Sequence, residues 1–214
     1  TEGVHIHIID AELMGKGEKE KKDLYIEGVQ NNGIINHYEY IINSEGTIEI
    51  RHVLKPEGKM PLWFPRIGLT LTVSDALDQV KWYGRGPQEN YPDRKTGYPM
   101  GIYASTVQAM YEPYLMPQDY GLRTDVRWLQ LTTDKGIGLQ FKMNEWFNFN
   151  IYPYSTDNLT KAMYTYQLQK QKGMTLNLDY ATTGVGCTAR GVFGAYKAMP
   201  QEYRRTISIR PMMK

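Results

Sequence analysis

The sequence contains a single cysteine, Cys187, among its 214 residues. One cysteine excludes an intrachain disulfide and any zinc site built on several thiolates. The shortage of cysteine fits a reducing compartment, and it fits equally well a periplasmic protein without disulfides. The compartment therefore stays open between cytoplasm and periplasm.

Long apolar runs and a strong charge of either sign are also missing. No stretch reaches the roughly 20 apolar residues of a membrane-spanning helix, so no membrane partner is expected. The net charge is only +2, and acidic residues interrupt the basic cluster around Lys19, so no nucleic-acid partner is expected. The chain opens at Thr1 without a signal peptide, and we expect it to be a piece of a longer protein.

Histidine is scarce and confined to the first quarter of the chain. His5 and His7 face one side of a predicted strand, a spacing that can bind zinc. No reliable third ligand is nearby, so the favoured interpretation is two exposed or pocket-lining side chains. The motifs for acyl, phosphoryl and hydride transfer are missing as well.

Tyrosine (17 residues) and glycine (20 residues) are abundant, as expected for sheets with tight turns. The sequence predicts one all-β sandwich domain over residues 1–214. Period-two alternation predicts strands at 4–8, 33–42, 47–54, 66–73, 78–83, 126–132, 136–143 and 174–180. Hairpin turns are predicted at 43–46 and 133–136, a short helix at 155–165 and a single helical turn at 193–199.

Residues 82–97 read WYGRGPQENYPDRKTG, and so many turn formers exclude a helix. Glu89 and Asp93 lie four residues apart on this loop. A glycosidase needs two carboxyls about 5–10 Å apart, and these two could reach that range. The favoured interpretation is that both acids form ion pairs that fix the loop, because buried charges need partners. The candidate partners are Arg85, Arg94 and Arg123.

A second dense segment, 111–128, reads YEPYLMPQDYGLRTDVRW. Its prolines exclude a helix, and its charges again alternate in sign. Aromatic faces beside fixed polar side chains are how proteins hold pyranose rings, although most such aromatics are core or interface residues. We expect the two segments to meet as neighbouring charged rims. In this hypothesis Glu89, Asp93 and Asp119 pair with Arg85, Arg94 and Arg123.

Several motifs together resemble one family. Residues 86–94 (GPQENYPDR) and 117–123 (PQDYGLR) are similar to signatures of the C-terminal small-chain domain of family 2 glycoside hydrolase β-galactosidases. The resemblance continues through 153–155 (PYS) and 176–186 (LNLDYATTGVG), and covers most of the chain in order. Departures include Asp119 where Glu is usual, and a last loop that lacks the family's tryptophan. They leave the galactose specificity open.

The resemblance implies a galactose-mutarotase-like β-supersandwich of two large antiparallel sheets, forming the last domain of a retaining β-galactosidase. Its catalytic glutamates would lie on a separate TIM barrel, so no catalytic residue is expected in this chain. The domain would pack on that barrel, and its last loop would reach toward the sugar site. The candidates for substrate binding or the domain interface are Trp82, Arg85, Glu89, Asp93, Arg94, Tyr114, Asp119 and Arg123.

The expected partners are the catalytic barrel and carbohydrate, and an oligomeric parent is left open. No cofactor is expected in this chain, while a divalent or sodium ion is left open for the parent enzyme. The main alternative is a stand-alone carbohydrate-binding or interface module without catalysis. An aldose 1-epimerase is less favoured, because that chemistry uses a histidine acid and no histidine follows His52.

Overall fold

The computed structural model describes residues 33–187 and 191–213. The predicted strand at 4–8, with His5 and His7, lies outside these residues. Within them the all-β class is confirmed, because nine strands form one large sheet in which every pairing is antiparallel. No helix in this part of the chain is long and apolar enough to cross a membrane.

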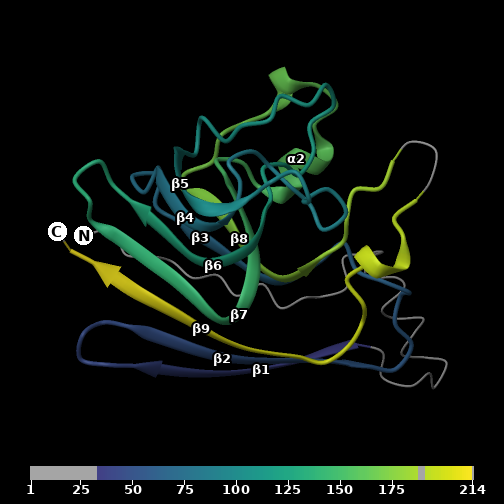
Figure 1. Cartoon of the computed structure of the whole chain (residues 1–214), viewed down its shortest axis with the longest axis horizontal. Coiled ribbons are helices and arrows are strands. Elements are labelled where there is room, and N and C mark those ends of the chain that lie inside the picture. The colour runs from purple at the N-terminus through teal and green to yellow at the C-terminus, as the bar shows by residue number, and fades with distance from the viewer. Residues whose placement is uncertain (1–32, 188–190, 214) are drawn as a thin grey trace.

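Figure 1 shows the elements in chain order. The strands are β1 (Gly33–Ile42), β2 (Ile48–Glu57), β3 (Arg66–Val73), β4 (Gln79–Arg85), β5 (Met100–Thr106), β6 (Arg123–Thr132), β7 (Gly138–Tyr152), β8 (Met174–Thr182) and β9 (Tyr203–Met212). The helices are α2 (Thr156–Lys161) and two 3-10 turns, η1 (Thr165–Gln167) and η2 (Gly194–Tyr196).

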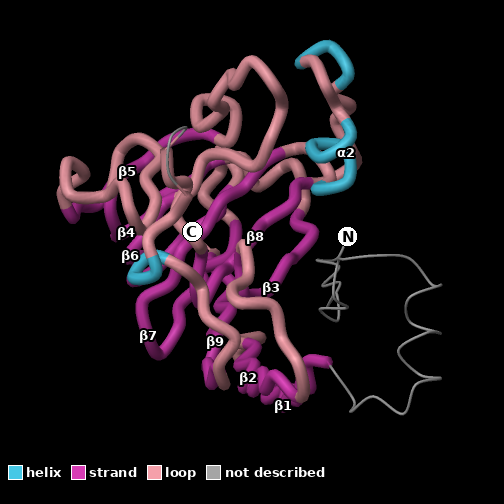
Figure 2. The backbone as a smooth tube through the Cα atoms, turned by 90° about the vertical axis from the view of Figure 1, so that its right-hand side faces the viewer, coloured by secondary structure: helices cyan, strands magenta, loops and turns pink. Residues whose placement is uncertain are grey.

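The sheet divides into two arms along β7. Residues 138–143 of β7 pair with β9, which continues to β2 and β1, whereas residues 148–152 pair with β8, which continues to β3. β6 runs along the other edge of β7 and leads to β4 and β5. The two layers of the sandwich are therefore joined in one hydrogen-bonded sheet. Figures 1 and 2 show β1 and β2 on one side of the molecule and α2 on the opposite side.

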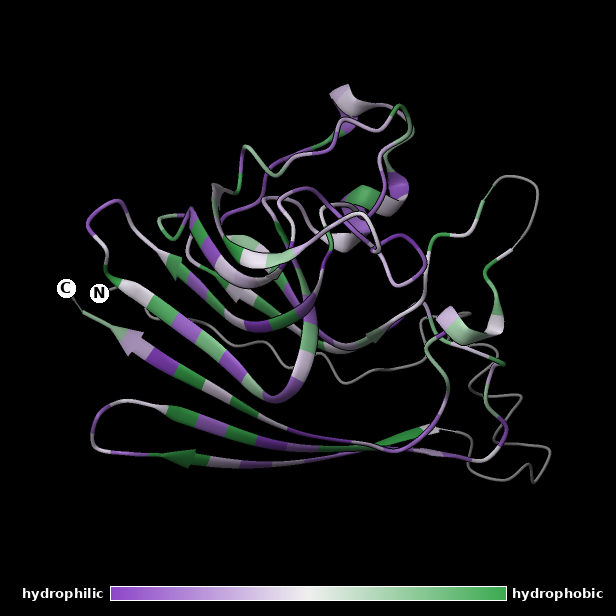
Figure 3. Ribbon diagram, in the orientation of Figure 1, coloured by the Kyte–Doolittle hydropathy of each residue, from purple (hydrophilic) through white to green (hydrophobic). Residues whose placement is uncertain are grey.

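The core lies between the two arms. Leu69 and Leu71 of β3 share one apolar cluster with Ile50 of β2 and Ile207 of β9. Figure 3 shows apolar and polar residues alternating along β7 and β9, as expected for strands with one buried face. A fully buried aliphatic side chain contributes about 1.5–3 kcal/mol, so this cluster fixes how the arms face each other.

Most predicted strands are confirmed, and the misses have local causes. β1 and β3 have the predicted bounds. β7 runs on to Tyr152, well past the predicted end at 143, and shifts in register against β6. β5 and β9 were not predicted, because the small residues of β5 and the charges of β9 weaken the apolar alternation.

The predicted helix is confirmed but short. The hydroxyl of Ser155 accepts a hydrogen bond from the backbone N–H of Asn158 and caps the N-terminus of α2. The helix ends at Lys161, because Ala162 returns to an extended backbone. The predicted turn at 193–199 is present as η2.

Candidate functional site

Two loops meet beside the ends of β4 and β6. The signature loop, residues 86–99, joins β4 to β5, and the tyrosine loop, residues 107–122, joins β5 to β6. Trp82 lies beneath them, 1 % exposed, and its indole N–H donates to the carbonyl of Arg85 at 3.0 Å. In the isolated domain Trp82 is therefore a core residue and presents no free face to a sugar.

Glu89 joins the two loops. From the signature loop, its carboxylate accepts hydrogen bonds from the guanidinium of Arg94 at 2.7 Å and the hydroxyl of Tyr91 at 3.3 Å. From the tyrosine loop, it accepts from the hydroxyl of Tyr114 and from the backbone N–H of Gly121 at 2.9 Å. The predicted Glu89–Arg94 ion pair is confirmed. Four donors around one buried carboxylate fix the relative position of both loops.

These contacts set the charge of Glu89. Burial by itself would raise its pKa, but the hydrogen bonds from Tyr114, Gly121 and Arg94 outweigh burial and lower the pKa below the usual glutamate value. Burial and the neighbouring carboxylate raise the pKa of Tyr114 to about 12, which keeps its hydroxyl a donor. Glu89 is thus held ionised, which disfavours a role as general acid.

Asn90 forms a second link between the loops that the sequence analysis missed. Its backbone N–H donates to the carbonyl of Leu122 at 2.8 Å. Its side-chain oxygen accepts from the backbone N–H of Thr124 at 3.1 Å and from the Thr124 hydroxyl at 2.5 Å. Asn90 is fully buried. A buried amide with these bonds holds the backbone of both loops in register.

Arg85 pairs with Asp125, a residue outside the predicted set of partners. Its Nε donates to the carboxylate of Asp125 at 2.6 Å, and its Nη1 donates to the carbonyls of Lys95 and Tyr98. Lys95 also binds Asp125, at 2.9 Å. Asp125 has φ of 56°, in the left-handed region where β-branched residues are disfavoured and Asp and Asn are tolerated. Burial alone would raise the pKa of Asp125, but its two cations lower it.

Asp93 binds a backbone segment in place of an arginine. Its two carboxylate oxygens accept hydrogen bonds from the backbone N–H groups of Val185 at 3.1 Å and Gly186 at 2.7 Å. A Cβ on Gly184 would overlap the Asp93 carboxyl group, so this close approach requires glycine. We call this contact the Asp93 clamp. It ties the signature loop to the segment that follows β8.

Arg123 is buried and lacks a carboxylate partner within the described residues. Its Nη1 donates to the carbonyl of Gly121 at 2.8 Å, and its guanidinium lies 5.5 Å from the ring centroid of Trp82. Burial lowers the pKa of Arg123 to about 10. The predicted carboxylate pairing of Arg123 is therefore wrong, because this guanidinium lies against the indole beneath the loops.

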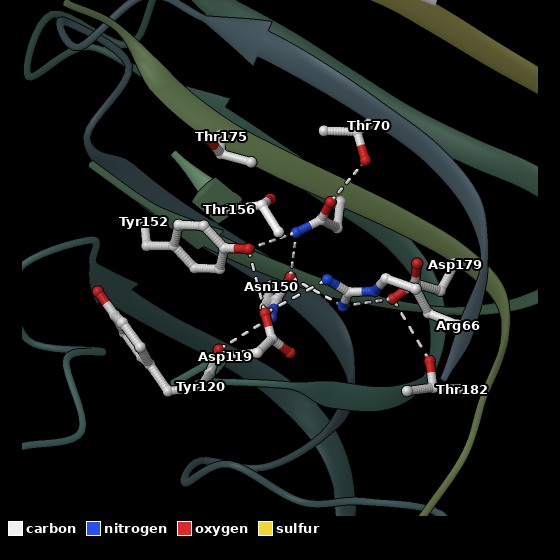
Figure 4. A network of polar contacts seen from close by, with 12 residues as sticks. Arg66, Thr70, Asp119, Tyr120, Asn150, Tyr152, Thr156, Thr175, Asp179 and Thr182 are labelled. Carbon is white, nitrogen blue, oxygen red and sulfur yellow. Dashed lines mark hydrogen bonds and ion pairs between the residues drawn. The ribbon is translucent and has the colours of Figure 1, made fainter. Parts of the chain in front are cut away.

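Asp119 is exposed, and it joins a polar network that extends inward to the buried Asp179 (Figure 4). It accepts hydrogen bonds from Arg66 at 3.3 Å, from the Asn150 amide at 2.9 Å and from the Tyr152 hydroxyl at 3.1 Å. Arg66 also binds the fully buried Asp179 at 2.8 Å. The predicted pairing of Asp119 with Arg85, Arg94 or Arg123 is wrong, since its arginine partner is Arg66 of β3.

The family match and the sequence relatives agree with each other. The chain matches the family described as beta galactosidase small chain over residues 5–209. It is 38% identical over 147 residues to a beta-galactosidase of Priestia megaterium, and 39% identical over 122 residues to that of Vibrio cholerae. The chain belongs to the β-galactosidase small-chain family.

The small-chain domain corresponds to a minor part of these relatives. The alignments cover 69% and 57% of this chain but only 14% and 11% of the Priestia and Vibrio enzymes. A crystal structure of a GalM/aldose epimerase homologue from C. elegans is 12% identical, with a TM-score of 0.43, and the match covers 86% of this chain and 61% of that one.

The structure brings the predicted site residues together at one end of the small-chain domain, but mostly as partners of groups that were not predicted. Only Glu89 and Arg94 form a predicted ion pair. The missed residues are Arg66, Asn90, Asp125, Asn150, Asp179 and Gly184. One signal was available, because Asn177 and Asp179 interrupt the apolar strand β8 on the same face. A role of the predicted residues in sugar binding or in a domain interface stays a prediction.

Proposed function

We propose that this chain is the C-terminal accessory domain of a β-galactosidase that hydrolyses terminal β-D-galactosides with retention. Its catalytic glutamates would lie on a barrel domain outside this chain. The small chain would pack on that barrel and help to shape the sugar site. Membership of the small-chain family and the size of the relatives support this proposal.

The Asp93 clamp is the observation that carries the proposal. Asp93 lies in the motif GPQENYPDR, which is typical of the family, and it binds the backbone of Val185 and Gly186. By the family resemblance, the segment after Gly186 is the loop that reaches toward the sugar site. The anchored backbone of Val185 and Gly186 would fix the point from which that loop starts, and fixed positions are what a substrate site requires.

An exposed apolar surface beside the clamp suits a partner domain. Residues 61–64 lie beside residues 184–187 and 191–199, to which they are joined by the bridge between Phe64 and Ala198 and by the hydrogen bond from the backbone N–H of Thr183 to the carbonyl of Pro65. Contiguous apolar surface of this kind is rare on monomeric proteins and marks interaction sites. Its exposed residues are Leu62, Trp63, Val185, Phe193 and Met199. We assign this surface to the contact with the catalytic barrel.

The test is hydrolysis of a chromogenic β-galactoside by this chain and by its full-length parent, measured side by side. We expect activity in the parent alone. Activity in the isolated chain would overturn the accessory role and return Glu89 and Asp93 to the list of catalytic candidates. Absence of activity in the parent would contradict the β-galactosidase assignment, and other β-glycosides would then be assayed.

A further inference from the structure

A pocket of about 560 Å³ opens beside the Asp93 clamp. It is lined by the signature loop, by the start of β6, the middle of β7 and the end of β8, by residues 195–198 and by Arg205 of β9. Its volume lies within the usual range for small-molecule sites. An accessory role on a barrel requires no such pocket, so this inference goes beyond the proposed function.

The walls of the pocket suit a sugar ring. Trp146 and Tyr196 line it, and both residues are substantially exposed, at 58 % and 40 %. The guanidinium of Arg127 lies 3.4 Å from the centroid of the Trp146 ring and holds that indole in place. Exposed aromatic rings offer flat apolar contacts to the C–H faces of a pyranose.

Two asparagine side chains of the pocket are held in place by hydrogen bonds and offer oriented polar groups to a ligand. The Asn148 side chain is held by the backbone N–H of Asp125 at 3.3 Å and by the Thr182 hydroxyl at 3.2 Å. Asn144 accepts from the backbone N–H of Thr206 at 3.0 Å, so its side-chain oxygen is bound within the protein and its amide N–H groups can donate to a ligand. A few oriented polar groups among aromatic walls are what confer specificity on such a site.

The positively charged side chains that line the pocket outnumber its carboxylates. Glu145 pairs with Arg205 at 2.9 Å, and Asp125 is shared by Arg85 and Lys95. Both acids that line the pocket are therefore neutralised. Lys197 also lines the pocket, and its ammonium lies 5.5 Å from the ring centroid of Trp63, with no ion pair to any residue of 33–187 or 191–213. A cation–π contact neutralises no charge, so this ammonium favours an anionic ligand.

We propose that this pocket binds a pyranose that carries a carboxylate. The ring would stack on the walls formed by Trp146 and Tyr196, and the carboxylate would pair with Lys197. A neutral hexose of the same shape would keep the stacking and lose the ion pair. A simple carboxylate would keep the ion pair and lose the stacking.

Calorimetric titration of the 214-residue chain with D-galacturonate, D-galactose and acetate tests this assignment. We expect galacturonate to bind roughly tenfold more tightly than either of the other two, since each lacks one half of the contacts. The Lys197→Gln variant should weaken galacturonate binding by about the same factor and leave galactose binding unchanged. Lys135→Gln, a charge removal on the exposed β6–β7 turn away from the pocket, is the matched control.

A second measurement does not depend on a variant. The indole N–H resonance of Trp146 should shift when galacturonate is added, whereas that of the buried Trp82 should not. Equal binding of galacturonate and galactose, equal binding of galacturonate and acetate, no binding at all, or an unchanged Trp146 resonance would each overturn the proposal. None of these results bears on whether the parent enzyme hydrolyses galactosides.

Discussion

Asp93 and Gly186 lie 93 residues apart in the sequence, yet the carboxylate of Asp93 accepts a 2.7 Å hydrogen bond from the backbone N–H of Gly186. The partner of Asp93 is a backbone N–H group, so no charge pattern in the sequence predicts this contact. Through this bond and its neighbour at Val185, the family signature holds the base of the loop after β8.

The Asp93→Ala variant should release that loop base without unfolding the domain. Each hydrogen bond to a carboxylate contributes about 1.5–3 kcal/mol, and part of that value is recovered when water reaches the exposed Val185 N–H. We expect a loss of about 1–3 kcal/mol in the free energy of unfolding. Amide hydrogen exchange at Val185 and Gly186 should accelerate far more than exchange in the core strands. Unchanged exchange at these two amides would contradict the clamp.

Gly184→Ala should reproduce the effect of Asp93→Ala, because the added Cβ would push the Asp93 carboxyl group away from its two N–H donors. A double-mutant cycle tests whether the two substitutions break the same contact. The double variant should be little less stable than either single variant, since both changes break the same contact. Additive losses would show that Gly184 acts elsewhere. Gly97→Ala, at a position where a Cβ meets no atom within 4 Å, is the control.

Glu89→Gln should disturb both loops together. The glutamine amide replaces one carboxylate oxygen by an NH2 donor, and that donor would face either Arg94 or the backbone N–H of Gly121, both of which are donors themselves. Leaving buried donors and a cation unpaired should cost about 2–4 kcal/mol of stability. Chemical denaturation measures the loss, and the exposed Glu45→Gln variant is the control.

The same Glu89 substitution should lower the activity of the full-length parent, if the two loops line its sugar site or its domain interface. Full activity together with unchanged stability would show that Glu89 is incidental. A loss of stability with full activity would restrict Glu89 to a structural role within the domain.

The sequence predicted strands well where one face is apolar. β3 reads RIGLTLTV, and its alternation predicts the bounds of the strand, in which every second residue is buried. The sequence pattern did not predict that β7 would bend between two partner strands, because the register shifts against β6 follow from long-range pairing. Alternation alone cannot supply that information.

For the candidate site, the sequence located the segments and missed most of the partners. The density of charge in 82–97 and 111–128 indicated two loops that need each other, and Glu89 does bridge them. The partner of Asp119 is Arg66, which comes from β3 and lies 53 residues away. Proximity along the chain favoured the wrong arginines. Ion pairs between distant segments depend on the tertiary fold, and the spacing of residues in a single sequence does not reveal them.

His52 links the two arms of the sandwich and should make stability depend on pH. It lies on β2, is 1 % exposed, and shares hydrogen bonds with the Tyr180 hydroxyl of β8 at 2.7 Å and with Asn36 of β1 at 3.0 Å. Burial lowers the pKa of His52 to about 4, whereas its unfolded value is 6.5. Between these two values the unfolded chain binds more protons than the folded one, so stability should rise with pH from 4 to 6.5.

The lowered pKa of His52 corresponds to about 3 kcal/mol in the free energy of unfolding. This contribution is present above pH 6.5 and is lost as the pH falls through 6.5 toward 4. Protonation of Glu89 and Asp125 in acid also destabilises the folded protein, because the pKa values of both carboxyls are lowered by folding. The informative quantity is therefore the difference in unfolding free energy between the wild type and His52→Gln, measured by denaturation from pH 4 to pH 7. That difference should shrink as the pH falls. A constant difference, or the same slope in the exposed His37→Gln control, would show that His52 is not held neutral between the arms.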